Sequence, residues 1–460
     1  MLRAAGAVAQ CSPSALPLHT IELLITDPPN HIRQSGFCGK DHYSPVMKPA
    51  FVVGILNAAL TTMWLFAGEE RRWHEETACR WTELGMPTQG KAGFAQLSPA
   101  ITGIVFTNTL TEASVAANRV LANGSGVAVG DYDRDGLPDI FFCGLESSNA
   151  LYKNLGNWKF KDVTVEAGLV FPRKPSRGAV FADINGDGFP DLLISTLDEG
   201  VLCFMNDGRG KFADKTVDAR TRSRYAAMTL ALADVDGDGT LDLYVANSRP
   251  TDIRDRGRMS VSVVNGNPLI PGGEKNRLLF KDGQLAEYGQ PDQLFKNDGK
   301  GRFTEVSWLG GGFVDETGQP LTGPPLDWGL TATFRDVNND LAPDLYVCND
   351  YWTPDRFWIN DGHGNFRAID QLALRKTSAS SMGVDFADID RDGHLDFFVV
   401  DMLSRDPRLR KRQGLAEKPV GSPLGSIANR PQTMRNTMFR NRGDGTFAEI
   451  ADFARVNGVR

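Results

Sequence analysis

GVAVGDYDRDGLPDIFFCGL, at residues 126–145, is the stretch that decides the fold, because the chain repeats its pattern four more times. The further copies are GAVFADINGDGFPDLLISTL (178–197), LALADVDGDGTLDLYVAN (230–247), TATFRDVNNDLAPDLYVCN (331–349) and GVDFADIDRDGHLDFFVVD (383–401). A second signature centred on Asn and Gly follows each copy: LYKNLGNWKF (151–160), LCFMNDGRGKF (202–212), LFKNDGKGRF (294–303), FWINDGHGNF (357–366) and MFRNRGDGTF (438–447). Because the two signatures alternate without exception, the chain is an array of one repeated unit.

Each unit predicts four antiparallel strands. In the first unit we expect them at 126–130, 140–143, 150–154 and 160–164, separated by an acidic loop and an Asn/Gly turn. Asn and Gly suit hairpin turns because they tolerate a positive φ. Such a repeat is typical of an all-β fold, a β-propeller of four-stranded antiparallel blades, whereas a β-sandwich does not predict one unit five times. The blades are expected at about 126–170, 178–220, 230–315, 331–375 and 383–459.

A segment before the first unit predicts one more strand. Residues 94–106 match residues 160–171, where the fourth strand of the first unit begins. A propeller usually closes by completing one blade with strands from both termini, so that no sheet edge stays open. The leading strand therefore suggests five complete blades of an incomplete, seven-bladed type of ring, in a chain that is a fragment. A closed five-bladed ring with a spare strand is the alternative.

Composition narrows the class of protein. The 460 residues are 41% hydrophobic, which suffices for a large core and excludes wholesale disorder. The formal net charge of −7 argues against a nucleic-acid partner. Of the 57 acidic residues, 18 lie in the five repeated loops, so the acidity is concentrated there.

The amino-terminal region predicts export. Residues 1–46 show no periodic apolar pattern and are expected to be an unstructured extension upstream of the true start at Met47. Residues 47–68 combine one Lys, an apolar run and a small residue near its end, as in a secretory signal peptide. An uncleaved membrane anchor and a buried core helix are the alternatives. Residues 69–93 are expected to be a linker, and 94–460 the repeat domain.

The acidic loops follow the pattern D-x-[DN]-x-D-G-x-x-D. Ca²⁺ takes roughly six to eight oxygen ligands at flexible distances, and this spacing lets them converge on one ion. Positions 1, 3, 5 and 9 would supply side-chain oxygens, and position 7 a backbone carbonyl. The predicted ligands of up to five Ca²⁺ ions are, loop by loop, Asp131, Asp133, Asp135, Leu137, Asp139; Asp183, Asn185, Asp187, Phe189, Asp191; Asp234, Asp236, Asp238, Thr240, Asp242; Asp336, Asn338, Asp340, Ala342, Asp344; and Asp388, Asp390, Asp392, His394, Asp396.

An EF-hand begins with the same residues, but it needs a Glu at position 12 and a helix on each side. The residues at position 12 are instead apolar strand residues: Phe142, Ile194, Val245, Val347 and Val399. Solvated turns without metal are the other alternative, yet so many carboxylates in one loop repel one another unless a cation compensates them. In the fourth loop Leu341 replaces Gly, and because a non-Gly residue resists a positive φ, this loop is expected to bind calcium less readily.

The acidic loops and their [F/Y]-x-N-x-G-x-x-x-F turns resemble the FG-GAP/VCBS repeats of integrin α-chain propellers and their bacterial relatives, over residues 94–460. The sequences NGSGVAVGDYDRDGLPDIFF and LYKNLGNWKFKDVTVEAGL resemble those of the ASPIC/UnbV-type group related to cartilage acidic protein. The resemblance implies secreted or surface calcium-binding propellers that bind partners and have no catalytic centre. Members of that group often carry a further carboxyl-terminal domain, which nothing in this sequence matches.

These features together predict an extracytoplasmic calcium-binding propeller, whether secreted, periplasmic or on the cell surface. It would serve as a binding or adhesion module for an extracellular protein or glycan and touch a membrane only through an amino-terminal anchor. Recognition is expected in the insertions at 248–290 and 402–436, because insertions in repeats often bind. The second insertion holds basic residues that could meet an anionic glycan, although a solvated loop is the more ordinary explanation: Arg405, Arg408, Arg410, Lys411 and Arg412.

Two other functions stay open: a non-catalytic accessory module of a larger secreted enzyme, and a propeller hydrolase or lyase. A catalytic carboxylate pair needs two different environments, whereas these aspartates recur in equivalent loops. The sequence also lacks HExxH, GxSxG and phosphate-cradling motifs, so catalysis is not expected. Cys143 and Cys348 are expected in the core of separate blades rather than in a disulfide, and Trp158, Trp308 and Trp328 are expected to pack between blades.

Overall fold

The structure is a computed structural model that describes residues 6–10, 73–75, 80–84, 94–172, 174–256, 262–264, 267–269, 277–281, 284–350, 353–402, 404, 406, 408–409 and 430–456. The chain divides into two units, Met1–Gln96 and Leu97–Arg460. In the first unit β1 (Gly6–Gln10), β2 (Trp73–Glu75) and β3 (Arg80–Leu84) form an antiparallel sheet in the order β1-β3-β2. β1 thus lies in the extension predicted to be unstructured, whereas the predicted signal segment 47–68 lies outside the described residues.

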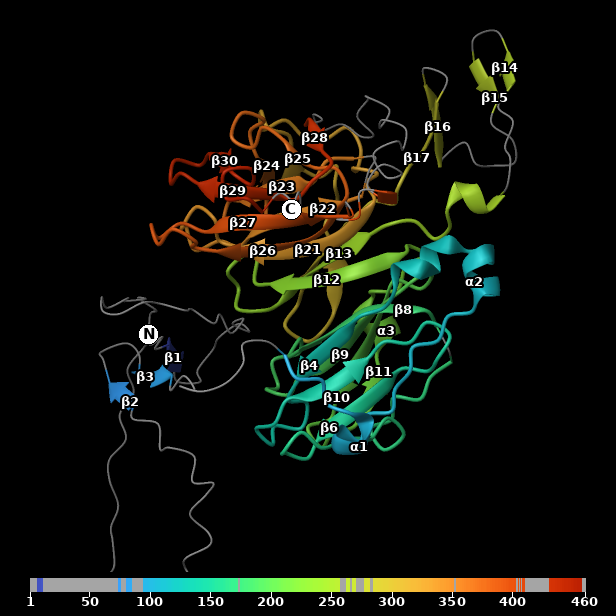
Figure 1. The fold of residues 1–460 in the computed structure, drawn as a ribbon, viewed down its shortest axis with the longest axis vertical. Coiled ribbons are helices and arrows are strands. Elements are labelled where there is room, and N and C mark those ends of the chain that lie inside the picture. The colour runs from blue at the N-terminus through green and yellow to red at the C-terminus, as the bar shows by residue number, and fades with distance from the viewer. Residues whose placement is uncertain are drawn as a thin grey trace, which may run out of the picture. The chain divides into compact units, whose positions relative to one another are not determined.

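The second unit confirms the propeller-type fold, because five of its described sheets each contain four antiparallel strands in chain order (Figure 1). We call these sheets blades one to five. Their strands are, blade by blade, β4 (Val127–Gly130), β5 (Asp139–Phe142), β6 (Ala150–Asn154), β7 (Phe160–Asp162); β8 (Ser176–Ala182), β9 (Asp191–Thr196), β10 (Val201–Asn206), β11 (Phe212–Asp214); β12 (Ala227–Ala233), β13 (Asp242–Asn247), β18 (Gln293–Asn297), β19 (Phe303–Glu305); β21 (Gly329–Arg335), β22 (Asp344–Asn349), β23 (Arg356–Asn360), β24 (Phe366–Ala368); and β26 (Ser381–Ala387), β27 (Asp396–Asp401), β29 (Thr437–Asn441), β30 (Phe447–Glu449).

The remaining elements of this unit lie between these strands or, for the first three helices, before β4. Blade four gains β20 (Phe313–Val314), which pairs in parallel with β24, and β25 (Thr377–Ser378) pairs in parallel with β28 (Gln432–Thr433). The first insertion holds two hairpins, β14 (Ser262–Val264) with β15 (Asn267–Leu269) and β16 (Leu278–Lys281) with β17 (Gln284–Glu287). The helices are short: α1 (Pro99–Thr102), α2 (Glu112–Ala117), α3 (Thr216–Ala219), and the 3₁₀ helices Arg119–Asn123 and Ile253–Arg256. Among the described residues, no helix is both long enough and apolar enough to cross a bilayer.

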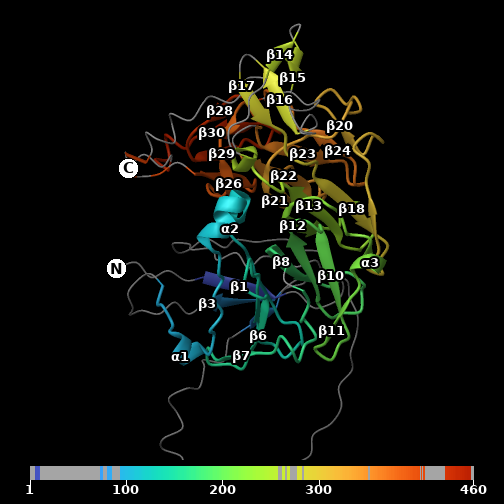
Figure 2. The same ribbon diagram turned by 90° about the vertical axis from the view of Figure 1, so that its right-hand side faces the viewer.

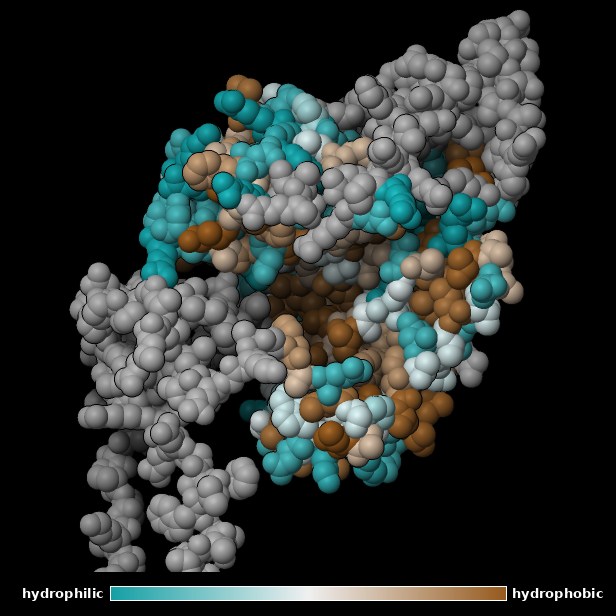
Figure 3. Space-filling view, viewed as in Figure 1, coloured by the Kyte–Doolittle hydropathy of each residue, from teal (hydrophilic) through white to brown (hydrophobic). Residues whose placement is uncertain are grey.

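The first strand of each blade lies beside the first strand of the next. β4 contacts β8, β8 contacts β12, β12 contacts β21, and β21 contacts β26, and Figure 2 shows β26, β21, β12 and β8 following one another through the unit. Figure 3 shows hydrophobic side chains, in brown, in the hollow that this row of strands borders. Val127 and Val129 of β4 are more than half exposed. The blades therefore radiate from their first strands, as in a propeller.

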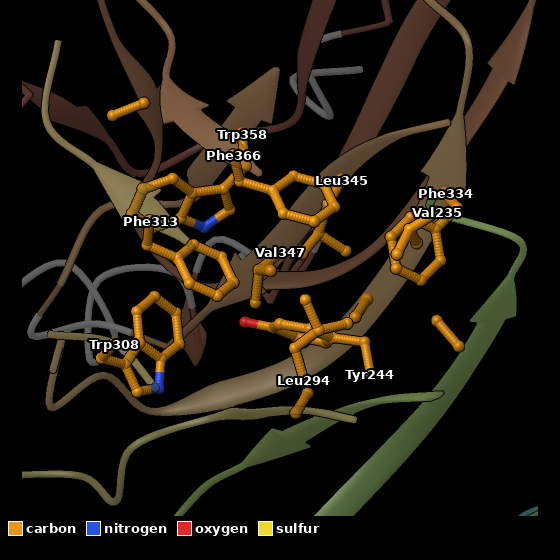
Figure 4. Close-up of a cluster of buried hydrophobic side chains, with 14 of the residues drawn as sticks. Val235, Tyr244, Leu294, Trp308, Phe313, Phe334, Leu345, Val347, Trp358 and Phe366 are labelled. Atoms are coloured by element: carbon orange, nitrogen blue, oxygen red, sulfur yellow. The ribbon is translucent and has the colours of Figure 1, made fainter. Parts of the chain in front are cut away.

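Apolar side chains fill the spaces between successive blades. One buried cluster joins blades one and two, a second joins two and three, a third joins three and four, and a fourth joins four and five. Figure 4 shows the third, in which Trp308 stacks on Phe313 with ring centroids 3.9 Å apart, beside Trp358. Packing between blades is thus confirmed for Trp308.

The structure confirms some of the other sequence-based predictions for the core and contradicts one. Cys143 and Cys348 are buried free cysteines in two different clusters, as predicted. Trp328 is buried, with the guanidinium of Arg249 3.5 Å from its ring centroid. Trp158 is 68% exposed, so its predicted packing role is wrong. It lies in the turn between β6 and β7 with a φ of 61°, a geometry that places it outside the sheet.

The strand predicted before the first unit is absent from the described residues at 94–106. Phe94 is fully exposed and α1 follows it. A fourth strand forms by pairing with a third strand, as β7 does with β6. The sequence match instead reflects the turn after that strand, since Gly103 and Gly168 both have a φ of 77°. A Cβ on either glycine would lie 3.0 Å or less from the carbonyl oxygen of the next blade's fourth strand, which explains the requirement for Gly.

In blades two to five, the Asn that ends the third strand connects its blade to the preceding one. In blade four, the Asn360 side-chain amide donates to the carbonyl of Pro343 at 3.2 Å and to that of Val235, in blade three, at 2.9 Å. Its Oδ1 accepts from the N–H of Gly362 at 3.1 Å. The bonds to the preceding blade in the other blades are Asn206 to Tyr132, Asn297 to Ile184, and Asn441 to Val337. We call these four residues, together with the equivalent Asn154 of blade one, the latch asparagines.

Replacing a latch asparagine should destabilise the protein more where the residue spans two blades. Asn360→Ala removes a buried bond between blades and leaves the Val235 carbonyl without its donor. Asn154, in blade one, donates to Pro138 of its own blade and supplies a matched control. Urea unfolding should show that Asn360→Ala loses about 1–2 kcal/mol more than Asn154→Ala. Equal losses would show that the bond between blades contributes nothing.

Candidate metal sites

The first Asp of each acidic loop is fixed by the loop's own backbone. Asp131 accepts the N–H of Asp135 on Oδ1 at 3.0 Å and that of Gly136 on Oδ2 at 2.8 Å. The carboxylate at position 5 then accepts the N–H of position 7, as Asp135 does from Leu137 at 3.0 Å. The same three bonds recur in the other four loops, around Asp183, Asp234, Asp336 and Asp388. Five different sequences therefore adopt one loop geometry.

The Asp at position 9 is the first residue of the second strand and is buried in every blade. Asp139 accepts the N–H of Tyr132 at 3.2 Å and the N–H of the latch residue Asn154 at 2.7 Å. The equivalent carboxylates, Asp191, Asp242, Asp344 and Asp396, repeat both bonds. Position 9 therefore ties the acidic loop to the Asn/Gly turn of the same blade.

Burial acts strongly on the position 9 carboxyls. It raises the pKa of Asp139 to about 6 and those of Asp191, Asp242 and Asp344 to about 7, and it raises the pKa of Asp396 as well. The two N–H donors partly oppose this shift, while neighbouring loop carboxylates reinforce it. A divalent cation beside these carboxylates would favour their charged form.

In three of the loops, the structure brings the predicted carboxylate ligands together. Oxygens from positions 1, 3 and 9 lie within 4.8 Å of one another in three triads: Asp131, Asp133, Asp139; Asp234, Asp236, Asp242; and Asp388, Asp390, Asp396. In the second and fourth loops, Asn185 and Asn338 occupy position 3 instead. The predicted carbonyl ligands at position 7 remain a prediction.

Two atoms within these triads need a partner. Oδ1 of Asp133 and Oδ1 of Asp236 are buried and accept no hydrogen bond. A buried carboxylate oxygen without a partner is costly, and a bound cation removes that cost. Because the donor set consists of hard oxygens around a loop of fixed geometry, the residues fit Ca²⁺.

The fourth loop keeps the shared geometry despite its departure from the pattern. Leu341 has a φ of 71°, close to the 85–87° of the glycines at this position in the other loops, and its N–H reaches Asp336 Oδ2 at 2.9 Å. The Leu341 side chain is 87% exposed, so it gains little from packing. The backbone therefore bears a left-handed conformation that a non-Gly residue resists.

A second set of buried aspartates was not predicted from the sequence. Asp292 accepts the Tyr244 hydroxyl at 2.7 Å and the Asn247 N–H at 2.6 Å. Asp355 likewise accepts the Tyr346 hydroxyl at 2.7 Å. Burial raises the pKa of Asp292 to about 8 and that of Asp355 to about 7. Both follow a Pro and precede the third strand, which is the sequence signal that could have identified them.

Asp292 lies in the interior, beside a buried ion pair and aromatic rings. Asp327 and Arg356 form a two-bond ion pair at 2.7 and 2.9 Å near Asp292. The space that Asp292, Asp327, Arg356 and the neighbouring aromatic rings enclose has no room for a water molecule. Of the basic residues predicted to meet a glycan, only Arg408 lies in the described part of the chain.

Leu341→Gly should stabilise the protein. Glycine adopts a positive φ without steric cost, so the substitution should raise the free energy of unfolding by about 1 kcal/mol. The reverse substitution in blade five, Gly393→Leu, should lower it by a similar amount. Urea unfolding in a calcium chelator measures both effects without a contribution from the metal. A destabilising Leu341→Gly would show that the leucine side chain makes a favourable contribution in the loop.

Known proteins contain repeats similar to those of this chain. Residues 131–194, 183–245 and 336–399 match the FG-GAP-like repeat family. Cartilage acidic protein 1 of Mus musculus is 28% identical over 127 residues, which are 27% of this chain and 20% of that protein. The Homo sapiens protein is 28% identical over 127 residues, 27% of this chain and 19% of that protein. The match therefore spans about a fifth of the length of these relatives.

Solved structures share the architecture only loosely. An Agrocybe aegerita lectin, described as recognising non-reducing terminal N-acetylglucosamine, is 18% identical, with 70% of this chain and 77% of that chain covered and a TM-score of 0.29. The V. cholerae biofilm matrix protein Bap1 is 13% identical, with 70% and 38% covered and a TM-score of 0.34. Residues 131–245 and 336–399 therefore carry FG-GAP-like repeats, and a stretch of 127 residues of this chain is similar to cartilage acidic protein 1.

Proposed function

We propose that this chain is an extracytoplasmic calcium-binding β-propeller that serves as a binding module for an extracellular protein or glycan. The observation that carries the calcium proposal is the convergence of carboxylates in loops of one geometry, with buried oxygens at Asp133 and Asp236 that lack a partner. Calcium would join the two ends of each acidic loop, between the first and second strands. Extracellular calcium modules bind at about 10⁻⁴–10⁻³ M, so such sites fill outside the cell.

A binding role fits these residues better than a catalytic one. The acidic loop recurs in all five blades with the same hydrogen bonds, as expected of a repeated binding site, whereas a catalytic carboxyl pair forms a single site. The unusual carboxylates outside the loops, Asp292 and Asp355, are packed inside blades. A non-catalytic accessory module of a larger secreted enzyme is compatible with the same features. Arrays of extracellular glycans and proteins, probed with and without calcium, test the binding half of the proposal.

Calcium should raise the thermal midpoint of unfolding. A ligand that binds only the folded state stabilises it, and at ten times its dissociation constant each filled site contributes about 1.4 kcal/mol. Scanning calorimetry of the full chain in calcium and in chelator measures the difference. Magnesium at the same concentration is the control and should stabilise less, because it demands a tighter octahedral geometry. Equal midpoints in calcium and chelator would contradict the proposal.

The stabilisation by calcium should grow between pH 5 and pH 8. Four of the position 9 carboxyls, Asp139, Asp191, Asp242 and Asp344, have folded-state pKa values of about 6 to 7, above the value near 3.9 of an unfolded Asp. Protons therefore stabilise the metal-free fold at low pH, and this contribution is lost as the pH rises through 6 to 7. Calcium replaces those protons, so the midpoint difference between calcium and chelator should be larger at pH 8 than at pH 5. A difference independent of pH would show that protons and calcium do not compete.

A further inference from the structure

The residue before each latch asparagine varies together with position 3 of the acidic loop. Where position 3 is Asp, the third strand carries a cation; where position 3 is Asn, the third strand carries an apolar residue. The pairs, from blade one to blade five, are Asp133 with Lys153, Asn185 with Met205, Asp236 with Lys296, Asn338 with Ile359, and Asp390 with Arg440. Counting the four acidic-loop positions and this strand residue, every blade has a formal charge of −3.

The three cations contact the loops that they face. Lys153 Nζ lies against Asp133 Oδ2 and 2.9 Å from Asp135 Oδ2. Lys296 Nζ lies 2.9 Å from Asp236 Oδ2. Arg440 contacts Oδ2 of Asp390 and lies 3.4 Å from Oδ2 of Asp392. The charge pattern in the sequence is therefore a set of ion pairs in space.

In blades one and three the cation engages one carboxylate oxygen and leaves the other. Lys153 and Lys296 contact Oδ2 of the position 3 aspartate. Oδ1 of the same two aspartates is buried and accepts no hydrogen bond. Each ion pair thus holds the carboxylate by one oxygen, while its other oxygen is buried and unpartnered.

In the second and fourth loops, where position 3 is Asn, the amide replaces the cation as the donor to Oδ2 of position 5. The Asn185 amide donates to Asp187 Oδ2 at 2.9 Å, and the Asn338 amide donates to Asp340 Oδ2 at 2.8 Å. Lys153 and Arg440 supply an N–H to the equivalent Oδ2 at position 5 in blades one and five. Since the amide already provides the donor, the third strand can carry Met205 or Ile359 there.

We infer that Lys153, Lys296 and Arg440 are positioning residues of the metal sites, an inference that rests on the proposed calcium binding. Each holds the position 3 carboxylate by Oδ2, leaves Oδ1 for the ion, and offsets the fourth negative charge of its loop. A fourth carboxylate without this partner would repel its neighbours in the metal-free state. The two kinds of blade thereby present calcium with the same net charge.

A double-mutant cycle in blade one tests this inference. The variants Asp133→Asn, Lys153→Met and the double variant convert the Asp/Lys pair into the Asn/Met pair of blade two. Asp133→Asn leaves the blade at −2 and should weaken its calcium site about tenfold, because ligand charge sets calcium affinity. Lys153→Met leaves −4 and should lower the midpoint of unfolding in chelator. The double variant restores −3 and should recover most of both losses.

Calorimetric titration with calcium and thermal unfolding in chelator supply the two measurements. Lys215→Met is the control, because the exposed Lys215 pairs with Asp218 after the fourth strand of blade two, outside the tested blade; it should change neither quantity. The cycle of Asp236→Asn and Lys296→Met in blade three repeats the test independently. Losses that simply add in the double variants, while wild type still binds calcium, would overturn the inference alone. A wild-type chain that binds no calcium would overturn both the inference and the proposed function.

Discussion

A buried carboxylate at the start of each second strand is the constraint on which the rest of the structure depends. Asp139 and its four equivalents accept one N–H from the acidic loop and one from the latch asparagine of the same blade. A buried charge is tolerated only when it is hydrogen-bonded or paired, so both donors must stay in place. One side chain thereby fixes the relation between the loop that connects the first two strands and the turn that connects the last two.

That constraint also connects neighbouring blades. The residue whose backbone N–H binds position 9 is the one whose side chain reaches the preceding blade, as Asn360 does to Val235. The Val235 carbonyl lies at position 2 of the preceding acidic loop, and the Val235 N–H binds that loop's own position 9, Asp242. Acidic loops and blade junctions are therefore one continuous hydrogen-bonded system. An ion that orders a loop would stabilise the junction with the following blade as well.

Each negative charge in these loops has its own stabilising surroundings. Position 1 is hydrogen-bonded by backbone N–H groups, position 9 is buried, and position 3 is either an amide or a carboxylate with its own cation. The fourth loop shows how strongly the geometry is specified, because Leu341 adopts a left-handed conformation rather than altering the loop. Local strain at one residue costs less than the loss of the bonds to Asp336 and Asp340.

The sequence by itself determined the repeat, its four strands, and the oxygen-bearing positions of each loop, because these depend on contacts within a few residues and on a period that recurs five times. The tertiary structure alone decided what depends on distant residues. The latch bond between Asn360 and Val235 joins positions 125 residues apart, and the Lys296 ion pair crosses the insertion to reach Asp236. The segment at 94–106 shows where prediction from the sequence fails. It carries the sequence of a fourth strand, but a strand needs a neighbour to accept its hydrogen bonds, and only its turn was retained.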